Sequence, residues 1–441
     1  MLLKNQSRLD DIEVEAVTSP WYPQKDSMVD EYEADGIIYQ RVIHPARKNS
    51  NSKFSHKLVK RFTNIGERKV SEERAKKSIF RSLFDFIYFG VFKIGRLCAK
   101  PLKIPWKIIE EKILMKYLED SLVSRYKNGN IDIIHAHTPY RVALPALRAA
   151  RKLSIPFVYE MRGMWEETAV ANGRWRRNGL AYRRFKKMEN KVLREADSVI
   201  TICASLKEVA INRGVASSKI VIVTNGVEKE FIDDESKSQS FEKISQQLSS
   251  KQGRVVVGYI GSLREMEGVD YIAKAVGTLV KSGIDLKFFC LTGETGQSQL
   301  RKVCADEGII DHSLVTGPIP HDEVPAIYDL IDIFVVSRPD YEVTRRVTPL
   351  KPFEAMGRGR AVVVSNLDAL VEIVQDGVTG IVSEADNIES LATAVNHLVG
   401  NPELREELGS NARTWVEQNR LWKDIVLETS KSYKVALTSK K

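Results

Sequence analysis

Two adjoining stretches of the sequence decide the fold: TPLKPFEAMGRG at residues 348–359 and AVVVS at residues 361–365. The first predicts a helix, and the second, a short run centred on three valines, predicts a strand. A strand without polar alternation is typical of a parallel sheet that is covered on both faces. The rest of the chain should therefore supply further helix–strand units.

The same alternation of strands and helices continues through the chain beyond residue 130, which predicts an α/β fold with parallel sheets. The expected strands are Ile131–Ile134, Phe157–Tyr159, Ser198–Ile202, Val255–Ile260, Leu286–Leu291, Ile333–Val336 and Ala361–Ser365. The expected helices include Leu144–Leu153, Tyr182–Ala196, Val269–Ser282 and Ile388–Val399.

A polar stretch rich in Ser, Gln and Lys interrupts this alternation at Glu230–Arg254 and indicates a connection between two α/β domains. The length of 441 residues fits two or three domains. We expect a first domain over residues 1–228, a linker over 229–254, a second domain over 255–420, and a terminal helix with a basic tail over 421–441.

The formal net charge of +9 is concentrated in one segment. Between Lys53 and Tyr117 there are 17 basic and six acidic side chains, so this segment carries +11 and the remainder −2. Among these charges the sequence predicts an aromatic helix that contains Phe80, Phe84, Phe86, Tyr88, Phe89 and Phe92. Basic and aromatic residues together suit an anionic membrane surface, which we favour over the alternative that the aromatics cover an exposed face of the first domain. No nucleic-acid-binding module accompanies the charge, so no nucleic-acid partner is expected.

Four scattered cysteines without CxxC spacing indicate free thiols in a reducing cytoplasm and argue against a disulfide framework or a zinc site. No run approaches the roughly 20 apolar residues that a membrane-spanning helix needs. We therefore expect a cytoplasmic protein, peripheral on the inner face of the plasma membrane.

Two histidines, His135 and His137, follow the first expected strand. Ligands of open α/β sheets collect beyond the carboxyl ends of the strands, and strand alternation would aim both side chains the same way. The alternative is a hydrogen-bonded pair that caps a loop. A third ligand at metal-binding spacing is missing, so no metal is expected.

Arg162 lies just beyond the next strand, where a guanidinium can hold a phosphate or a carboxylate. The alternative is a surface ion pair with Glu166 or Glu167, which contributes little energetically.

The glycine-rich loops of the second domain are candidates for binding a diphosphate. GYIGSL at residues 258–263 follows a strand and precedes a helix, so backbone N–H groups and a helix N-terminus can approach phosphate there. Thr292-Gly293 repeats the pattern after the next strand, and Gly317-Pro318-Ile319 offers a flat edge suited to a base.

Lys351 and Glu354 lie three residues apart on the first turn of the helix quoted at the outset, hence on one face. The cation suits a nucleotide diphosphate and the anion suits a pair of ribose hydroxyls. The alternative is a salt bridge between the two on a solvated helix.

Taken together and in this order, these stretches resemble the retaining glycosyltransferases of family 4, especially bacterial members that build exopolysaccharide or lipopolysaccharide. The resemblance runs from about Val14 to Arg420, and its most specific element is Glu-Ala-Met-x-x-Gly-x-x-Val-Val at Glu354–Val363. The stretches that carry it are His135–Tyr140, Arg162–Glu167, Asn225–Val227, Gly258–Leu263, Gly317–Pro320 and Thr348–Gly359.

The resemblance implies a GT-B fold, in which two Rossmann-like domains face each other across a cleft. It also implies a metal-independent hexosyltransferase without a cofactor, which uses a nucleotide-sugar donor and a glycan or lipid-linked acceptor. By resemblance, His137 lies near the donor sugar, Arg162 on the acceptor or phosphate side, Lys351 at the diphosphate and Glu354 at the ribose. The further donor contacts expected are Gly261, Ser262, Arg264, Gly293, Gly317, Ile319, Arg345, Arg346, Pro349 and Leu350.

Three features depart from the family pattern. Arg346 stands where the family has its first motif glutamate. Ser262 and Glu267 stand where many relatives have an arginine and a lysine, so neutralising the diphosphate would shift to Lys351, Arg345 or Arg346. The family's first strand and glycine-rich loop are missing before Glu13–Thr18, and we expect the true start to lie upstream.

Two other functions fit the same motifs. One is a nucleotide-sugar epimerase with the GT-B fold. The other is a non-catalytic protein that binds nucleotide sugars or acts as a scaffold partner in a glycan-assembly complex.

Overall fold

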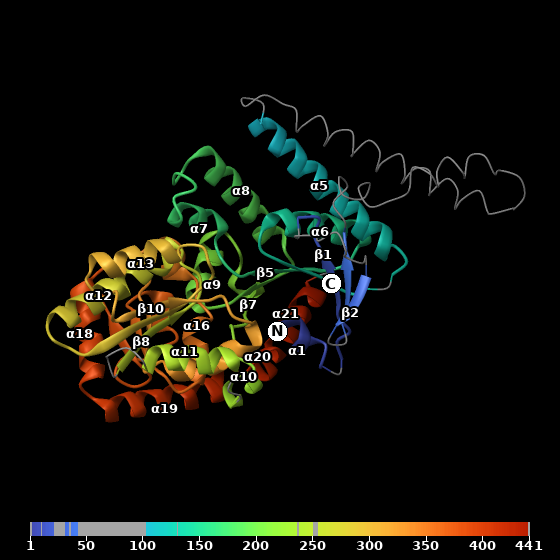
Figure 1. Ribbon diagram of the computed structural model, residues 1–441. Helices are drawn as coiled ribbons and strands as arrows, with labels where there is room; N and C mark the ends of the chain where they lie inside the picture. The colour runs from blue at the N-terminus through green and yellow to red at the C-terminus, as the bar shows by residue number, and fades with distance from the viewer. Residues whose placement is uncertain are drawn as a thin grey trace, which may run out of the picture. The chain divides into compact units, whose positions relative to one another are not determined.

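The computed structural model describes residues 2–9, 11–21, 31–34, 37–42, 103–129, 131–235, 238–249 and 255–439 (Figure 1). The chain divides into two compact units, a larger one formed by Met1–Asn5 with Val158–Lys441 and a smaller one formed by Gln6–Phe157. Most of the basic segment 53–117, including the six aromatic residues from Phe80 to Phe92, lies outside the described residues. Its role at a membrane, like the division at residues 228 and 254, stays a prediction.

The centre of the larger unit is a six-stranded parallel sheet with the order β10-β9-β8-β11-β12-β13. Numbered along the chain, this order is 3-2-1-4-5-6, which is that of the Rossmann fold. Four strands have the bounds expected from the sequence, and β10 and β13 were not expected. The strands are β8 (Val255–Ile260), β9 (Leu286–Leu291), β10 (Ser313–Thr316), β11 (Ile333–Val336), β12 (Ala361–Ser365) and β13 (Ile381–Ser383).

Both faces of this sheet are buried, as continuous apolar strands require. Phe288 packs into the core on one face and its neighbour Phe289 into the core on the other. Helices α12 (Val269–Lys281), α13 (Gln297–Asp306) and α18 (Ile388–Val399) cover the first face. Helices α16 (Lys351–Gly357) and α19 (Pro402–Asn419) cover the second.

A further set of parallel strands belongs to the same unit: β5 (Phe157–Met161), β6 (Ser198–Thr201) and β7 (Ile220–Ile222). The helices between them are α7 (Trp165–Ala171), α8 (Leu180–Glu195) and α9 (Ala204–Asn212).

The end of the chain returns to these strands. Helix α20 (Trp422–Ile425) leads into α21 (Leu427–Thr438), which packs on β6 and β7. There Ser432 Oγ lies 2.8 Å from Ser198 Oγ. The closing helix expected from the sequence therefore belongs to the β5–β7 strands, although it follows the last helix of the six-stranded sheet.

The stretch expected as a plain connection contains two helices, α10 (Lys229–Asp233) and α11 (Gln239–Ser249). Phe241, Ile244 and Leu248 recur at helical spacing in α11 and pack against the second core of the sheet. The polar composition of the stretch hid this narrow apolar stripe.

The smaller unit contains a three-stranded sheet with the order β1-β3-β2, formed by β1 (Glu15–Thr18), β2 (Glu31–Ala34) and β3 (Ile37–Arg41). Strand β1 corresponds to the first strand expected at Glu13–Thr18. Helix α1 (Leu2–Gln6) precedes it.

The other described elements of this unit are α5 (Lys103–Tyr126), β4 (Ile134–His137) and α6 (Tyr140–Leu153). Helix α5 packs on α6, and its Leu114 and Leu118 are buried. Buried Glu111 accepts hydrogen bonds from Tyr140 Oη at 2.6 Å and Arg141 Nε at 3.0 Å. The part of the basic segment that is described thus contributes to a core.

Among the described residues, no helix combines the length and apolar character needed to cross a bilayer. Cys203, Cys290 and Cys304 are free and buried thiols, as expected. Cys98 lies outside the described residues.

Candidate functional site

The candidate site lies where the six-stranded sheet reverses its strand order, between β8 and β11. Helix α12, which follows β8, covers one face of the sheet, and α16, which follows β11, covers the other. The crevice left at the carboxyl ends of two such strands is where open α/β sheets bind ligands. Gly261 follows β8 directly, and Arg338 follows β11 by two residues.

At this place three charged side chains form a cluster. Nη2 of Arg338 lies 3.0 Å from Oε1 of Glu267, and Nζ of Lys351 lies 3.1 Å from Oε2 of the same carboxylate. Glu267 and Arg338 are each 5% exposed, and the Lys351 side chain is 18% exposed. One buried anion thus meets two cations, which leaves a net positive charge at the edge of the crevice.

The cluster fixes the charge state of Glu267. Burial by itself raises the pKa of this carboxyl, but the positive charges of Arg338 and Lys351 and their hydrogen bonds outweigh burial and lower it to about 2. Burial lowers the pKa of Lys351 below that of an ordinary lysine, against the opposing effect of Glu267. Glu267 is therefore an anion at neutral pH and a fixed partner for the lysine ammonium.

The Lys351 side chain passes close to Gly261 and needs the space that a side chain there would fill. A Cβ atom at residue 261 would lie 2.2 Å from Cε of Lys351, and φ of Gly261 is +149°, a conformation that other residues rarely adopt. The ammonium then lies 5.5 Å from the centre of the Tyr259 ring. The Tyr259 hydroxyl donates to the carbonyl of Ser262 at 3.1 Å, which holds the turn.

Glu354 has a partner of its own. The Tyr328 hydroxyl donates to its Oε2 at 2.6 Å, and burial together with the Glu354 charge raises the pKa of Tyr328 well above its ordinary value. The alternative of a salt bridge between Lys351 and Glu354 on a solvated helix is wrong. Lys351 pairs with Glu267, and helix α16 buries Phe353 and Met356. Glu354 and Lys351 are held separately, by different elements.

The two outer glycine loops are joined by a single side chain. Nε2 of Gln297, at the start of α13, donates to the carbonyl of Gly293 at 3.2 Å and to that of Gly317 at 3.1 Å. Ile319 is half-buried against the second core of the sheet.

The other expected donor residues differ in exposure. Arg264 is exposed and directly precedes the short helix that carries Glu267. Pro349 is buried, whereas Leu350 is 42% exposed.

Arg345 and Arg346 were expected to help neutralise a diphosphate, but both make ion pairs within the chain. Arg345 pairs with Asp340. Arg346 lies 3.0 Å from Asp368 and 3.3 Å from Glu208. The cation beside Lys351 is instead Arg338, which sequence reasoning missed although it lies two residues beyond an expected strand.

Arg162 lies just beyond β5, as expected, and is held on two sides. Nη1 lies 2.5 Å from buried Glu160, and Nη2 donates to Oδ1 of Asn225 at 2.8 Å. Nδ2 of Asn225 in turn donates to the carbonyl of Thr348 at 3.4 Å. These contacts therefore link Arg162 to Thr348, which lies shortly before helix α16.

The alternative partners expected for Arg162 are engaged elsewhere. Glu166 pairs with Arg213 at 2.6 Å, and Glu167 accepts a hydrogen bond from Tyr182. Asn225, Glu160 and Tyr328 were missed as site residues. For Asn225 the signal was its place in the Asn-Gly-Val stretch.

The two histidines lie in strand β4 itself, whereas the sequence placed them beyond the strand end. The difference arises because β4 begins at Ile134, whose N–H donates to the carbonyl of Pro156 at 3.1 Å. His135 and His137 share one face of the strand, as alternation predicts, and their rings stack with centroids 4.9 Å apart. They belong to the smaller unit, and the expected role of His137 at the donor sugar stays a prediction.

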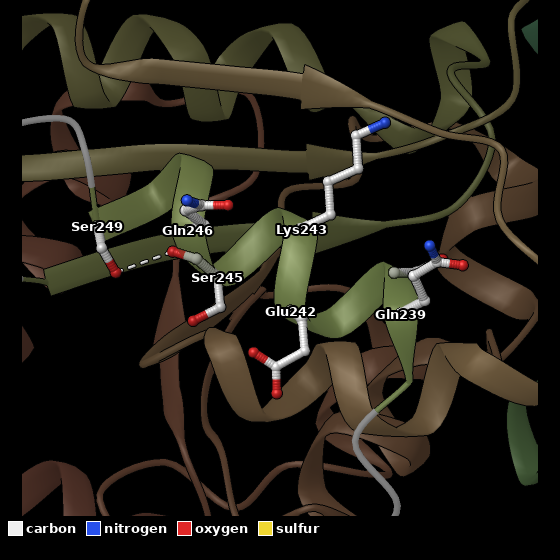
Figure 2. Close-up of a pocket in the computed structure, with 7 residues that line it drawn as sticks. Gln239, Glu242, Lys243, Ser245, Gln246 and Ser249 are labelled. Atoms are coloured by element: carbon white, nitrogen blue, oxygen red, sulfur yellow. Dashed lines mark hydrogen bonds between the residues drawn. The ribbon is translucent and has the colours of Figure 1, made fainter.

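A surface hollow elsewhere on the larger unit carries no such chemistry (Figure 2). All seven lining residues come from the single helix α11, and none was a predicted site residue. In Figure 2, Lys243 and Glu242 point to different sides of the helix and form no common binding group.

Two family models match separate parts of the chain. The model described as Glycosyltransferase Family 4 matches residues 96–231, and the model described as Glycosyl transferases group 1 matches residues 240–415. An uncharacterized glycosyltransferase of Methanocaldococcus jannaschii is 26% identical over 58% of this chain. The chain spans 63% of that relative's own length, which is less than two thirds.

Solved structures show the same fold. Sucrose-phosphate synthase from Thermosynechococcus elongatus has a TM-score of 0.67 at 14% identity, covering 98% of this chain and 91% of that one. Anabaena HepE in complex with UDP has a TM-score of 0.60 at 16% identity, covering 72% and 81%. The fold is thus that of the GT-B glycosyltransferases. Residues 96–231 are similar to Glycosyltransferase Family 4, and residues 240–415 are similar to Glycosyl transferases group 1.

Proposed function

We propose that this protein is a retaining glycosyltransferase that moves a hexose from a nucleotide-sugar donor to a glycan or lipid-linked acceptor in surface polysaccharide synthesis. The observation that carries the proposal is the Glu267–Arg338–Lys351 cluster at the strand-order reversal, beside the glycine turn at Gly261. Its surplus positive charge is partly withdrawn from water, where it attracts an anion more strongly than an exposed cation does.

The charge chemistry follows from these positions. When the bond between the sugar and the diphosphate breaks, negative charge grows on the departing phosphate oxygen. The ammonium of Lys351 and the guanidinium of Arg338 stabilise this charge without reorganising, because Glu267 already holds both in place. Glu354, oriented by Tyr328, accepts hydrogen bonds from the ribose hydroxyls. In this proposal the cluster's cations neutralise the diphosphate, and no metal or cofactor is assigned to the reaction.

Retention of configuration requires no side-chain base. The acceptor oxygen bonds to the anomeric carbon from the face that the diphosphate leaves, and the carbon–oxygen bond to the phosphate breaks. The acceptor proton passes to the departing phosphate oxygen, so charge and atoms balance. The protein's contribution is then alignment and electrostatic stabilisation.

One protein of known structure guides the choice of donor, and the proposed location guides the choice of acceptor. HepE from Anabaena has been solved with UDP and with UDP-glucose, which supports uridine diphosphate sugars as the first donors to test. An acceptor anchored in lipid would suit a protein that works at the inner face of the plasma membrane, and we include that location in the proposal.

The test is release of nucleoside diphosphate from a panel of nucleotide sugars, with lipid-linked and free glycan acceptors. We expect one donor to give acceptor-dependent release with a product of retained anomeric configuration by NMR, and Glu354→Ala to abolish it. Acceptor-independent conversion to an epimer would indicate the epimerase instead.

A second candidate is a non-catalytic partner that binds nucleotide sugars. The observation in its favour is Arg346, which occupies the position of the family's first motif glutamate and pairs with Asp368 and Glu208. Tight donor binding without release for any acceptor would favour this candidate.

A further inference from the structure

A strongly basic surface of the larger unit takes no part in the donor site. Between Arg174 and Arg194 the sequence has nine basic side chains and one acidic side chain. That acid, Glu189, is buried and accepts a hydrogen bond from Tyr159 at 2.5 Å, so it does not face solvent. We name the exposed part of this region the α8 basic face, formed by Arg174, Arg176, Arg183, Lys187, Lys191 and Arg194.

In helix α8 the exposed cations and the buried side chains lie on different faces. Tyr182, Phe185 and Val192 are buried and anchor the helix. Arg183, Lys187 and Lys191 follow one another at intervals of four residues, so they are neighbours on the outward face. The helix has 16 residues, and the row of cations runs along most of its length.

Few acidic side chains of the described residues neutralise this row of cations. Lys191 has one ion pair, with Glu195 at 3.8 Å. In the part of the chain that the structure describes, Arg174, Arg176, Arg183, Lys187 and Arg194 have no acidic partner. Like charges four residues apart on a helix repel each other. The packing of α8 does not require these cations, since none of them is among its buried residues, and an external anionic partner would relieve the repulsion.

Leu180 indicates the kind of partner. It is the first residue of α8, it is 86% exposed, and it lies between the arginines of the preceding loop and Arg183. A phosphate-rich polymer offers no apolar partner for such a side chain, whereas the boundary between headgroups and acyl chains does. The nearby Trp175 is half-buried with its ring 5.5 Å from that of Phe185, so it is not displayed for stacking on nucleic-acid bases.

We propose that the α8 basic face, together with Leu180, binds an anionic phospholipid surface. The cations interact with the lipid phosphates while Leu180 enters the headgroup–acyl boundary. This contact is independent of the donor site, because none of its residues belongs to the Lys351 cluster. It also differs from any contact made by residues 53–102, and the experiment separates the two.

The experiment is flotation of the full-length protein with vesicles of phosphatidylcholine alone or with 30 mol% phosphatidylglycerol, at low and high salt. The test variant is Arg183→Gln/Lys187→Gln/Lys191→Gln. The matched control is Lys302→Gln/Lys423→Gln/Lys434→Gln, which removes the same charge from exposed positions on α13, α20 and α21. Thermal unfolding and nucleoside diphosphate affinity are measured for both, and neither should change in the test variant.

We expect the wild type to bind only the anionic vesicles and to be released by salt. A cation at such a surface is worth about a fivefold change in partition, so the test variant should bind about a hundredfold more weakly while the control keeps nearly all binding. Leu180→Ser should weaken binding to the anionic vesicles at low salt. Equal binding of test and control variants, or no binding of the wild type to anionic vesicles, would overturn the proposal. Selective binding to RNA in a competition assay would also overturn it.

Discussion

The ammonium of Lys351 lies 3.1 Å from one carboxylate oxygen of Glu267, and the guanidinium of Arg338 lies 3.0 Å from the other. A glutamate at this position appears from the sequence to weaken a site that must bind a diphosphate. The structure shows a different consequence. The carboxylate compensates one of two cations that burial would otherwise disfavour, and it fixes both at the end of strands β8 and β11.

Replacing Glu267 by glutamine should destabilise the fold. Two cations would then lie close together without their anion, and breaking a buried ion pair in this way typically costs about 3–5 kcal/mol. Chemical denaturation of Glu267→Gln measures this loss. Glu265→Gln, on the same short helix but exposed, is the control and should change the free energy of unfolding by less than about 0.5 kcal/mol. Equal effects of the two substitutions would contradict the account.

The same pair predicts how stability depends on pH. The pKa of Glu267 is about 2 in the folded protein, below its ordinary value of 4.5. Because the folded-state pKa is lowered, the stabilisation is fully present above pH 4.5 and is lost as the pH falls from 4.5 toward 2. The difference in unfolding free energy between wild type and Glu267→Gln should therefore shrink on acidification through this range. A difference that stays constant down to pH 3 would show that the carboxylate charge is not the cause.

Gly261→Ala should weaken donor binding without unfolding the protein. The new methyl group would lie 2.2 Å from Cε of Lys351, and the lysine must leave its position. Losing a charged hydrogen bond to the diphosphate costs about 1.5–3 kcal/mol, which corresponds to roughly 10- to 150-fold in affinity. Gly283→Ala is the matched control, because Gly283 also has a positive φ, +83°, its added Cβ meets nothing within 4 Å, and it lies outside the predicted donor site. Calorimetric titration with nucleoside diphosphate should separate the two variants, and equal affinities would argue against the path assigned to Lys351.

Tyr328→Phe should reduce donor affinity severalfold and lower the free energy of unfolding by about 1 kcal/mol, because Glu354 loses the hydrogen bond that orients it. Tyr271→Phe removes a comparable hydroxyl, bound to Asp386 at 3.2 Å, and serves as the control. If Glu354 binds the ribose, the effect of Tyr328→Phe should disappear in a Glu354→Ala background. An undiminished effect there would place Tyr328 outside the donor site.

Arg346→Gln should change stability slightly and leave donor affinity unaltered. Its guanidinium pairs with Asp368 and Glu208, both largely exposed, and such pairs contribute about 0–1 kcal/mol. Binding assays and thermal unfolding of this variant check both expectations. A tenfold loss of donor affinity would instead assign Arg346 to the sugar.

The sequence predicted most of the sheet because its longer strands are mainly apolar. β8, β9, β11 and β12 have the bounds that their apolar runs indicated. Strands β10 and β13 were not found, since runs as short as Ile381–Ser383 carry too little pattern. α11 was missed because three apolar residues in a polar stretch are a weak signal.

The candidate site was predicted in part. Spacing alone placed Lys351 and Glu354 on one turn, and strand ends marked Gly261 and Arg162. The partners that orient these groups could not be predicted, because Glu267, Arg338 and Tyr328 come from separate segments of the chain and only the folded sheet brings them together. The same limit explains the expectation that Arg345 and Arg346 face a diphosphate, since their acidic partners are distant in sequence or belong to other elements.

The central claim is that Lys351 binds the diphosphate of a nucleotide donor. It is tested most directly by titrating wild type and Lys351→Met with the best-binding nucleoside diphosphate and with its parent nucleoside. The account predicts that the wild type binds the diphosphate at least tenfold more tightly than the nucleoside, an increment of about 1.4 kcal/mol or more. In Lys351→Met most of this preference should be lost while nucleoside affinity is kept. An undiminished preference for the diphosphate in Lys351→Met would contradict the account.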